Sequence, residues 1–248
     1  KLFFFCKQFL KMFFISKSTF LQNTIYTPEN IPVIFEDKDI LVIKKPVGIL
    51  SEDSQKGEKG ILSYLENDER KTLHLLHRLD REVGGVMVIA KNKKSASFLS
   101  TEIANGGFKK EYLAVTDGIP QEDNGIFEDL LFKDSKKNRS YVVKRDRKGV
   151  KKASLEYEVL EKKQGKALVK VLLHTGRTHQ IRVQFSSRKT PLTGDIKYGS
   201  KDRTNSDIAL HSYRISFRHP MTGDDMVFSC EPDYSTYPWS LFGGENNA

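Results

Sequence analysis

Residues 74–91 hold the groups of this chain that are best placed to do chemistry. Asp80 follows two basic residues, His77 and Arg78, and Arg81 comes directly after it. A carboxylate in a basic surround stays ionised at neutral pH, because nearby positive charge favours its charged form. Such a group suits a nucleophile or a base that works beside an anionic substrate. A salt-bridged aspartate on a surface turn explains the same residues, and taken alone they favour that explanation.

An apolar run after Asp80 predicts the element that positions it. Val86–Ala90 follows Gly84 and Gly85 directly. An apolar run of this length beside turn-forming residues is typical of a buried strand. Asp80 is therefore expected on a turn at the mouth of a sheet.

Apolar periodicity along the rest of the chain predicts many strands and few helices. We expect strands over 33–35, 40–43, 109–115, 166–174, 209–217 and 226–230. We expect helices over 61–67 and 93–104, and a third helix that begins at 175–178 with Thr178 as its N-cap. This pattern is that of an α+β domain.

The segment 133–152 is the most basic part of the chain. It holds ten Lys or Arg residues against Asp134 and Asp146. We expect a strand around Tyr141, a turn at 146–149 and a returning strand from 153 to 160. A two-stranded basic ribbon of this kind can follow a phosphate backbone. A solvated sheet edge, whose lysines prevent aggregation, explains the segment equally well.

Composition narrows the class of partner and of cofactor. The 248 residues include 41 Lys or Arg and 32 Asp or Glu, which give a formal charge of +9. This surplus favours a polyanionic partner, with nucleic acid ahead of an anionic membrane. The two cysteines give no disulfide framework, so we expect a reducing compartment, the cytoplasm. The histidine spacings match no zinc site, and no phosphate loop, nucleophile elbow or dinucleotide motif is present.

The domain organisation is expected to be simple. Residues 1–30 are expected to form a poorly ordered N-terminal extension, because lysines interrupt their apolar runs. Residues 31–242 are expected to form one domain, and residues 243–248 a tail. No uncharged apolar stretch approaches the length that spans a bilayer.

Several motifs, taken together and in order, resemble those of the RluA-type pseudouridine synthases. The resemblance covers roughly residues 31–233. At positions 83 and 84 the family pattern has Thr and Ser, whereas this chain has Val83 and Gly84. The matching motifs are Lys45-Pro46-Val47-Gly48, His77-Arg78-Leu79-Asp80, Lys110-Glu111-Tyr112-Leu113-Ala114, the run from Thr175 to Val183, Gly194-Asp195, Tyr198-Gly199, Leu210-His211 and His219-Pro220.

The resemblance implies a fold and a role for each matching residue. The fold is α+β, a mixed and mostly antiparallel sheet with flanking helices and a central RNA-binding cleft. Asp80 is then the catalytic aspartate, which attacks or deprotonates the sugar of a target uridine. Arg182 pairs with it, and Tyr112 stacks on the base and is a candidate to take the proton from C5. Arg78 is expected to enter the space that the flipped base leaves.

The implied partner is a structured RNA, either ribosomal or transfer RNA. The reaction is an isomerisation, so no cofactor or metal is implied, and neither is a membrane or an obligate protein partner. We expect a monomer. The candidate RNA contacts are Lys45, His77, Arg78, Lys110, Arg177, His179 and Gln180. An RNA-binding assembly factor without catalysis and a histidine-based ribonuclease are the alternatives from other classes.

Overall fold

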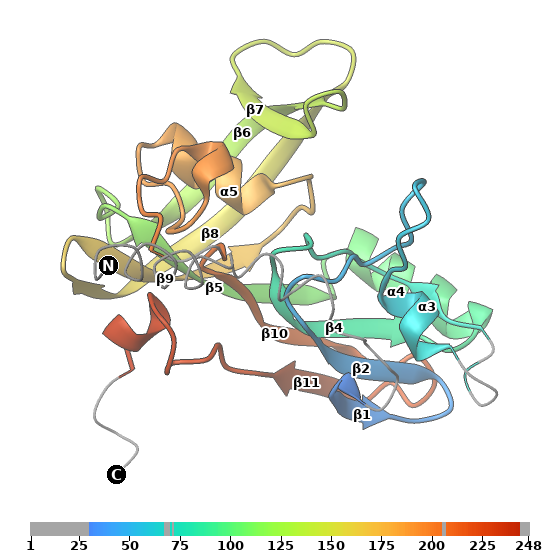
Figure 1. Cartoon of the computed structure of the whole chain (residues 1–248). Helices are drawn as coiled ribbons and strands as arrows, with labels where there is room; N and C mark the ends of the chain where they lie inside the picture. The colour runs from blue at the N-terminus through green and yellow to red at the C-terminus, as the bar shows by residue number, and fades with distance from the viewer. Residues whose placement is uncertain (1–29, 67–69, 71, 205–206, 244–248) are drawn as a thin grey trace, which may run out of the picture.

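Runs of β-branched and other apolar residues form the strands at the centre of one mixed sheet of eleven strands (Figure 1). The computed structural model describes residues 30–66, 70, 72–204 and 207–243. The strands are β1 (Val33–Glu36), β2 (Ile40–Lys45), β3 (His74–Leu75), β4 (Gly84–Ala90), β5 (Lys109–Asp117), β6 (Asn124–Asp134), β7 (Arg139–Val143), β8 (Val150–Lys163), β9 (Lys166–Leu173), β10 (Leu210–Arg218) and β11 (Asp225–Ser229). The helices are α3 (Ile61–Leu65), α4 (Lys93–Ala104) and α5 (Gln180–Ser187), with short 3-10 turns η2 (Ile196–Tyr198) and η3 (Trp239–Leu241).

The strand order divides the sheet into two halves that meet at β4 and β10. The order is β1-β2-β4-β10-β5-β9-β8-β6-β7, with β11 on β10 and β3 on β4. The two halves meet in a short parallel pairing, in which Gly84 lies opposite His211 and Gly85 opposite Ser212. Every other pairing between these strands is antiparallel. Groups on the two halves are therefore brought together along this junction.

Successive side chains of the buried strands point to opposite faces of the sheet, as the two-residue period of a strand requires. Met87 on β4 packs in the same cluster as Ile61 of α3. Val88, the next residue, packs with Leu99 of α4 on the other face. Helix α5 joins the first cluster through Phe185, which contacts two aromatic rings of β6 and β8. Helices α3 and α5 thus contribute to the same core cluster, and α4 covers the opposite face.

Two expectations drawn from the sequence are wrong. The segment 133–152 is not one hairpin, because β7 pairs with β6 (Phe132 lies opposite Tyr141) and β8 pairs with β6 and β9 instead. Helix α5 begins after His179, which has a left-handed backbone with φ of 53°, so Thr178 is not its N-cap. The predicted α+β class, the strands over 33–35 and 40–43 and the helix over 93–104 are confirmed.

The predicted extension over 1–30 lies outside the described residues except for Asn30, and the predicted tail does so except for Gly243. Among the described residues, no helix combines the length and the apolar character needed to cross a bilayer.

Candidate active site

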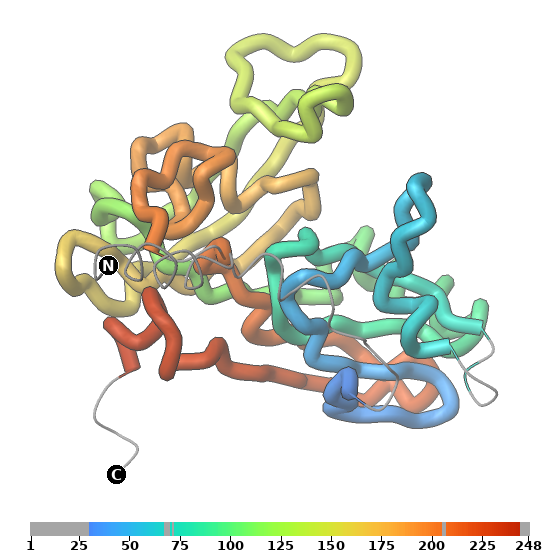
Figure 2. The backbone as a smooth tube through the Cα atoms, in the orientation of Figure 1, coloured from blue at the N-terminus to red at the C-terminus, as the bar shows by residue number. Residues whose placement is uncertain are grey.

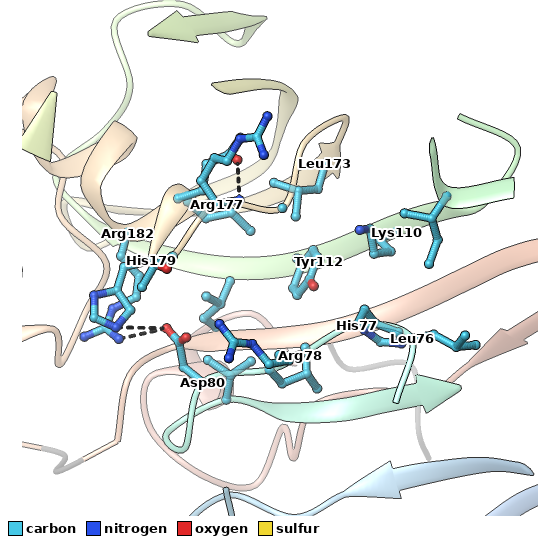
Figure 3. A pocket seen from close by; sticks show the side chains of 18 of the residues that line it. Leu76, His77, Arg78, Asp80, Lys110, Tyr112, Leu173, Arg177, His179 and Arg182 are labelled. Carbon is cyan, nitrogen blue, oxygen red and sulfur yellow. Dashed lines mark hydrogen bonds and ion pairs between the residues drawn. The ribbon is translucent and has the colours of Figure 1, made fainter. Parts of the chain in front are cut away.

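A pocket of about 550 Å³ lies between the loop that leads into β4 and the loop that leads into α5 (Figure 3). Both loops belong to the motifs that the sequence singles out, although they are about a hundred residues apart. Strand β5 runs behind them and forms the back wall. The side chains that line the pocket include Leu76, His77, Arg78, Asp80, Lys110, Tyr112, Leu173, Arg177, His179, Gln180, Arg182 and Leu210.

The loop that carries Asp80 is fixed by a buried lysine. The amine of Lys45 donates to the carbonyl oxygens of Pro46 and Val83, both at 2.9 Å, and lies 3.4 Å from that of Asp80. The backbone N–H of Val83 donates to the Asp80 carbonyl at 3.0 Å and closes the turn. Burial lowers the pKa of Lys45 to about 7, although the nearby carboxylate of Asp80 acts against it.

The burial and bonding of Lys45 argue against the predicted contact between this lysine and RNA. Only 1% of its surface is exposed, and its amine is already bound to backbone carbonyls inside the protein. A lysine in this position cannot reach a phosphate without leaving a buried set of carbonyl groups unpaired, which is costly. Its observed contacts hold the Asp80 turn.

The residues that replace the family's hydroxyls fit tightly in this turn. Val83 is buried in the apolar core. A Cβ atom at Gly84 would lie 3.1 Å from Val47 Cγ2 and 3.2 Å from the Lys45 carbonyl oxygen. At Gly85, with φ of 119°, a Cβ would lie 2.2 Å from the Ser212 carbonyl oxygen, so only glycine allows the two strands to meet. The lysine, rather than a hydroxyl at either position, fixes this turn.

Arg182 holds Asp80 from the other half of the sheet. Its Nη1 donates to Asp80 Oδ2 at 2.9 Å, and its Nε and Nη2 donate to the two oxygens of Asp195 at 2.7 and 3.0 Å. The arginine is 3% exposed and the side chain of Asp195 is fully buried. Burial acts to lower the pKa of Arg182, but the bonds to both carboxylates outweigh it and raise that pKa. The guanidinium is a permanently charged, oriented partner of Asp80.

Tyr112 faces Asp80 across the pocket from β5 (Figure 3). It is 5% exposed. Burial, and then the charge of Asp80, raise the pKa of the Tyr112 phenol above its usual value. The phenol therefore keeps its proton at neutral pH and presents an aromatic surface beside the carboxylate.

His179 is oriented by a second tyrosine. Tyr198 Oη accepts the backbone N–H of Ser140 at 2.8 Å and lies 2.9 Å from His179 Nδ1. Because the phenol already accepts from that N–H, its own hydrogen is assigned to Nδ1, which leaves the ring proton on Nε2. His179 Nε2 is 3.8 Å from Asp80 Oδ2. Burial lowers the pKa of His179, so the ring is a neutral donor directed towards Asp80.

The remaining predicted RNA contacts divide into exposed and enclosed groups. Arg78 and Arg177 are exposed at the pocket rim, and Lys110 lies inside it. His77 accepts the backbone N–H of Val88 at Nε2, and its Nδ1 is buried without a partner among the described residues. Burial and Lys110 lower the pKa of His77 to about 3, so this neutral ring is part of the pocket wall and not a ligand for phosphate.

The predicted RNA contact by Gln180 is also not supported. Its Oε1 accepts from the Thr175 hydroxyl at 2.8 Å and from the Arg177 backbone N–H at 3.0 Å. Its Nε2 donates to the Ser154 carbonyl at 3.1 Å. The buried amide therefore holds the loop before α5 in shape.

Two residues with a role in the geometry were not assigned one from the sequence. Asp195 binds Arg182 in two places, and Tyr198 orients His179. Both stand in short motifs, Gly194-Asp195 and Tyr198-Gly199, that the resemblance includes. A buried carboxylate near an arginine-bearing helix is the feature that spacing alone cannot reveal.

One group of side chains elsewhere has the proximity of a metal site. Asp37, Asp39 and His219 place their ligand atoms within 4.8 Å of one another, and the described residues contain no other such group. His219 Nδ1 lies 3.3 and 3.2 Å from the donating backbone N–H groups of Met221 and Thr222. Nε2 then carries the ring proton and donates to Asp37 Oδ2 at 2.8 Å. A ring that donates at Nε2 is not a metal ligand, so this group is explained as a hydrogen-bonded network.

The chain is similar to known proteins over most of its length. The model of the RNA pseudouridylate synthase family matches residues 39–187. An uncharacterized RNA pseudouridine synthase of Aquifex aeolicus is 35% identical over 239 residues, which cover 86% of this chain and 74% of the relative. Ribosomal large subunit pseudouridine synthase C of Buchnera aphidicola is 32% identical over 212 residues, 81% of this chain and 67% of the relative.

A solved structure extends the agreement to the fold. Human RNA pseudouridylate synthase domain containing 4 superposes with a TM-score of 0.67 at 25% identity, over 82% of this chain and 89% of that one. The matched residues 39–187 include Asp80, Tyr112 and Arg182. The matched segment therefore includes these three pocket residues.

Proposed function

This chain belongs to the RNA pseudouridylate synthase family, and we propose that it converts specific uridines of a structured RNA to pseudouridine with Asp80 as the catalytic carboxylate. The enzyme is thus an isomerase that acts on RNA. The observation that carries the role of Asp80 is its bond to the buried Arg182, opposite Tyr112, in a pocket that can enclose a flipped nucleotide.

The charges around Asp80 suit either of two first steps. In one, the carboxylate attacks C1′ of the sugar; in the other, it takes the proton from C2′. Both steps need an oriented carboxylate that carries negative charge. Arg182 orients the Asp80 carboxylate through the bond from its Nη1 to Oδ2 at 2.9 Å, and its positive charge favours the charged form. Because Asp195 shares the same guanidinium, the three groups keep a net negative charge, and Asp80 is not fully neutralised. The freed uracil then turns against the ring of Tyr112 and rejoins the sugar through C5.

The basic arm, which we define as residues 133–152, is the surface that we propose for the RNA backbone. It comprises the end of β6, β7, the start of β8 and the loops between them, at the top of Figure 2. None of its lysines or arginines forms an ion pair within the described part of the chain. Cations without acidic partners are free to bind phosphates.

The basic arm is joined directly to the rim of the pocket. Ser140 of β7 donates its hydroxyl to the Thr178 carbonyl at 2.6 Å, and Arg177 Nε donates to the Lys152 carbonyl at 3.0 Å. RNA bound along the arm would therefore lie beside the loop that carries His179. This continuity supports the arm as part of the substrate surface rather than a separate solvated edge.

Reversing two charges on the arm is expected to weaken RNA binding. Lys144→Glu with Arg145→Glu should lower affinity and flatten the salt dependence, by about 0.7 to 0.9 in log–log slope for each phosphate that the variant no longer binds. Filter binding at several salt concentrations measures this. The matched control is Lys162→Glu with Lys163→Glu, which makes the same charge change at the far end of β8. Equal losses of affinity in both variants would show a general charge effect and contradict the proposed surface.

Arg78 is expected to assist base flipping. Its exposed guanidinium is bound to Glu52 at 2.9 Å, and this weak surface pair can be exchanged for a place in the RNA stack. Arg78→Ala should slow turnover on a paired target more than on an unpaired one, by about tenfold for each 1.4 kcal/mol of flipping energy that is lost. Single-turnover assays on the two RNAs compare the rates. Arg81→Ala removes a similar exposed pair, with Glu58, and should leave both rates unchanged.

The substrate is proposed to be a stem-loop of ribosomal or transfer RNA. The name of one relative, ribosomal large subunit pseudouridine synthase C, supports ribosomal RNA as the first RNA to test. We also propose that residues 31–242 form the catalytic domain and act as a monomer, since one chain supplies all the pocket groups described above. The free thiol of Cys230 fits the cytoplasm as its compartment.

Mapping of pseudouridines in total RNA, with and without the gene, tests the proposal and identifies the site. We expect one or a few uridines to lose their modification and to regain it when purified protein is added. An unchanged map together with impaired ribosome assembly would indicate an assembly factor. Shortened RNA would indicate a ribonuclease, because isomerisation changes neither length nor mass.

A further inference from the structure

Lys110 is a buried amine that faces the pocket without a partner. It stands two residues before Tyr112 on β5, so both side chains point to the same face (Figure 3). Lys110 is 8% exposed and lines the pocket. Its side-chain nitrogen makes no hydrogen bond or ion pair with any residue that the structure describes. Buried lysines are almost always paired, so this one requires an explanation.

The direction of the Lys110 side chain places its nitrogen over the pocket. A Cβ atom built on Gly176, in the loop before α5, would lie 3.7 Å from Lys110 Nζ. The amine thus reaches from β5 towards the opposite rim, beside the surface that Tyr112 presents. A base stacked on Tyr112 would lie within reach, since alternate residues of a strand are only about 7 Å apart.

Lys110 and the ionisable groups near it in the pocket differ in their capacity to accept a proton. Burial lowers the pKa of Lys110, which increases the fraction present as the neutral amine. Burial raises the pKa of Tyr112, and its phenol is therefore a poor proton acceptor at neutral pH. The neighbouring His77 ring is neutral, and its Nδ1 is enclosed. Asp80 is bonded to Arg182 and, in the proposed reaction, acts on the sugar.

We propose that Lys110, rather than Tyr112, is the general base that removes the proton from C5 of uracil after C5 has bonded to C1′. This inference rests on the proposed function. In this mechanism the ring of Tyr112 stacks on the uracil, and the unpaired amine of Lys110 accepts the C5 proton.

The step balances without a further reactant. When the C1′–N1 bond breaks, its electron pair stays on N1. C5 then bonds to C1′ with the C5–C6 π electrons, and the N1 pair forms an N1–C6 double bond. If Asp80 has attacked C1′, the bond between them breaks at this point and its electron pair returns to the carboxylate. If Asp80 has instead taken the C2′ proton, it returns that proton to C2′ of the C1′–C2′ double bond, which leaves C1′ able to accept the pair from C5. The Lys110 amine takes the C5 proton, the C–H pair restores the C5–C6 double bond, and N1 regains its electrons and a proton from solvent. Lys110 returns the C5 proton to solvent, and Asp80 is regenerated as a carboxylate.

The test is an isotope effect in variants that separate charge from basicity. Lys110→Arg keeps a cation that could bind phosphate, but a guanidinium cannot act as a base at neutral pH. Lys110→Met removes both properties. With an RNA target carrying deuterium at uracil C5, we expect both variants to turn over about 10² to 10⁴ times more slowly than the unaltered enzyme. We also expect them to show a primary isotope effect that the unaltered enzyme lacks, because proton removal becomes limiting.

Lys109→Met is the matched control, since the exposed Lys109 precedes Lys110 on the same strand. It should retain normal turnover without an isotope effect. Wild-type turnover by Lys110→Arg would overturn the proposal. So would slow turnover of both variants without an isotope effect, which would indicate a phosphate contact. If both variants unfold in thermal melts, Lys110→Ala supplemented with ethylamine replaces them, and failure of the amine to raise its rate overturns the proposal. Absence of pseudouridine formation by the unaltered enzyme would instead contradict the proposed function.

Discussion

Asp80→Asn is expected to abolish pseudouridine formation, with turnover lowered by about 10⁴-fold or more. The amide has the shape of the carboxylate, but it can neither attack C1′ nor accept a proton from C2′. Arg182 keeps its two bonds to Asp195, so the fold and the pocket should be retained. RNA affinity should stay near that of the unaltered protein. Release of tritium from RNA labelled at uracil C5 measures the reaction, and filter binding measures the affinity.

Glu82→Gln is the matched control for Asp80→Asn. Its carboxylate is on the same loop and lies 3.8 Å from Arg182 Nη1, but it is 47% exposed. Removing this charge should leave tritium release close to normal. Undiminished release by Asp80→Asn would contradict the assignment, and a large loss in Glu82→Gln would show that charge at the loop, rather than the identity of Asp80, controls the reaction.

Arg182→Ala is expected to lower both stability and activity. It leaves the carboxylate of Asp195, which has no exposed surface, without its positively charged partner. Removing one member of a buried ion pair costs about 3 to 5 kcal/mol of unfolding free energy. Turnover should fall as well, because Asp80 loses the donor that orients it. Urea unfolding measures the stability, and tritium release from the fraction that remains folded measures the activity.

Two further variants separate the causes of that loss. Arg188→Ala removes an arginine six residues later, whose partly exposed pair with Asp129 should be worth about 0 to 1 kcal/mol. Arg182→Met combined with Asp195→Asn removes both buried charges, and it should recover part of the stability but none of the activity. A loss of stability below about 1 kcal/mol in Arg182→Ala would contradict the view that Asp195 depends on this arginine.

Local features of the fold could be predicted from the sequence because they depend on residues that are close together along the chain. The strand β4 follows from a continuous apolar run after two glycines, and α4 from apolar residues at helical spacing. Strand β6 was not predicted, since its buried and exposed positions do not alternate regularly. The predicted pairing of β7 with the strand that follows it is wrong. A basic turn between two strands is typical of a hairpin, but these two strands do not pair with each other. The chain instead returns across the end of β6 to form β8.

The candidate site depends on contacts between residues that are far apart in the sequence, and local sequence patterns do not predict such contacts. Asp80 and Arg182 were selected together by resemblance, not by spacing, because they are 102 residues apart. Lys45 is a candidate RNA contact from the sequence, but its amine donates to the carbonyl of Val83, 38 residues later in the chain, inside the protein. Asp195 was part of a matching motif, yet its role appears only when it is seen against α5.

The position of β10 between β4 and β5 has a consequence for how the protein is made. This strand joins the two halves of the sheet, but it comes after residue 209 in the chain. As a chain emerges from the ribosome, Asp80 is available long before Arg182, and both precede the strand that brings their halves together. A partly synthesised chain therefore carries its basic arm and its aspartate without a finished pocket. The pocket is complete only after β10 has been added, because Leu210 of this strand lines it.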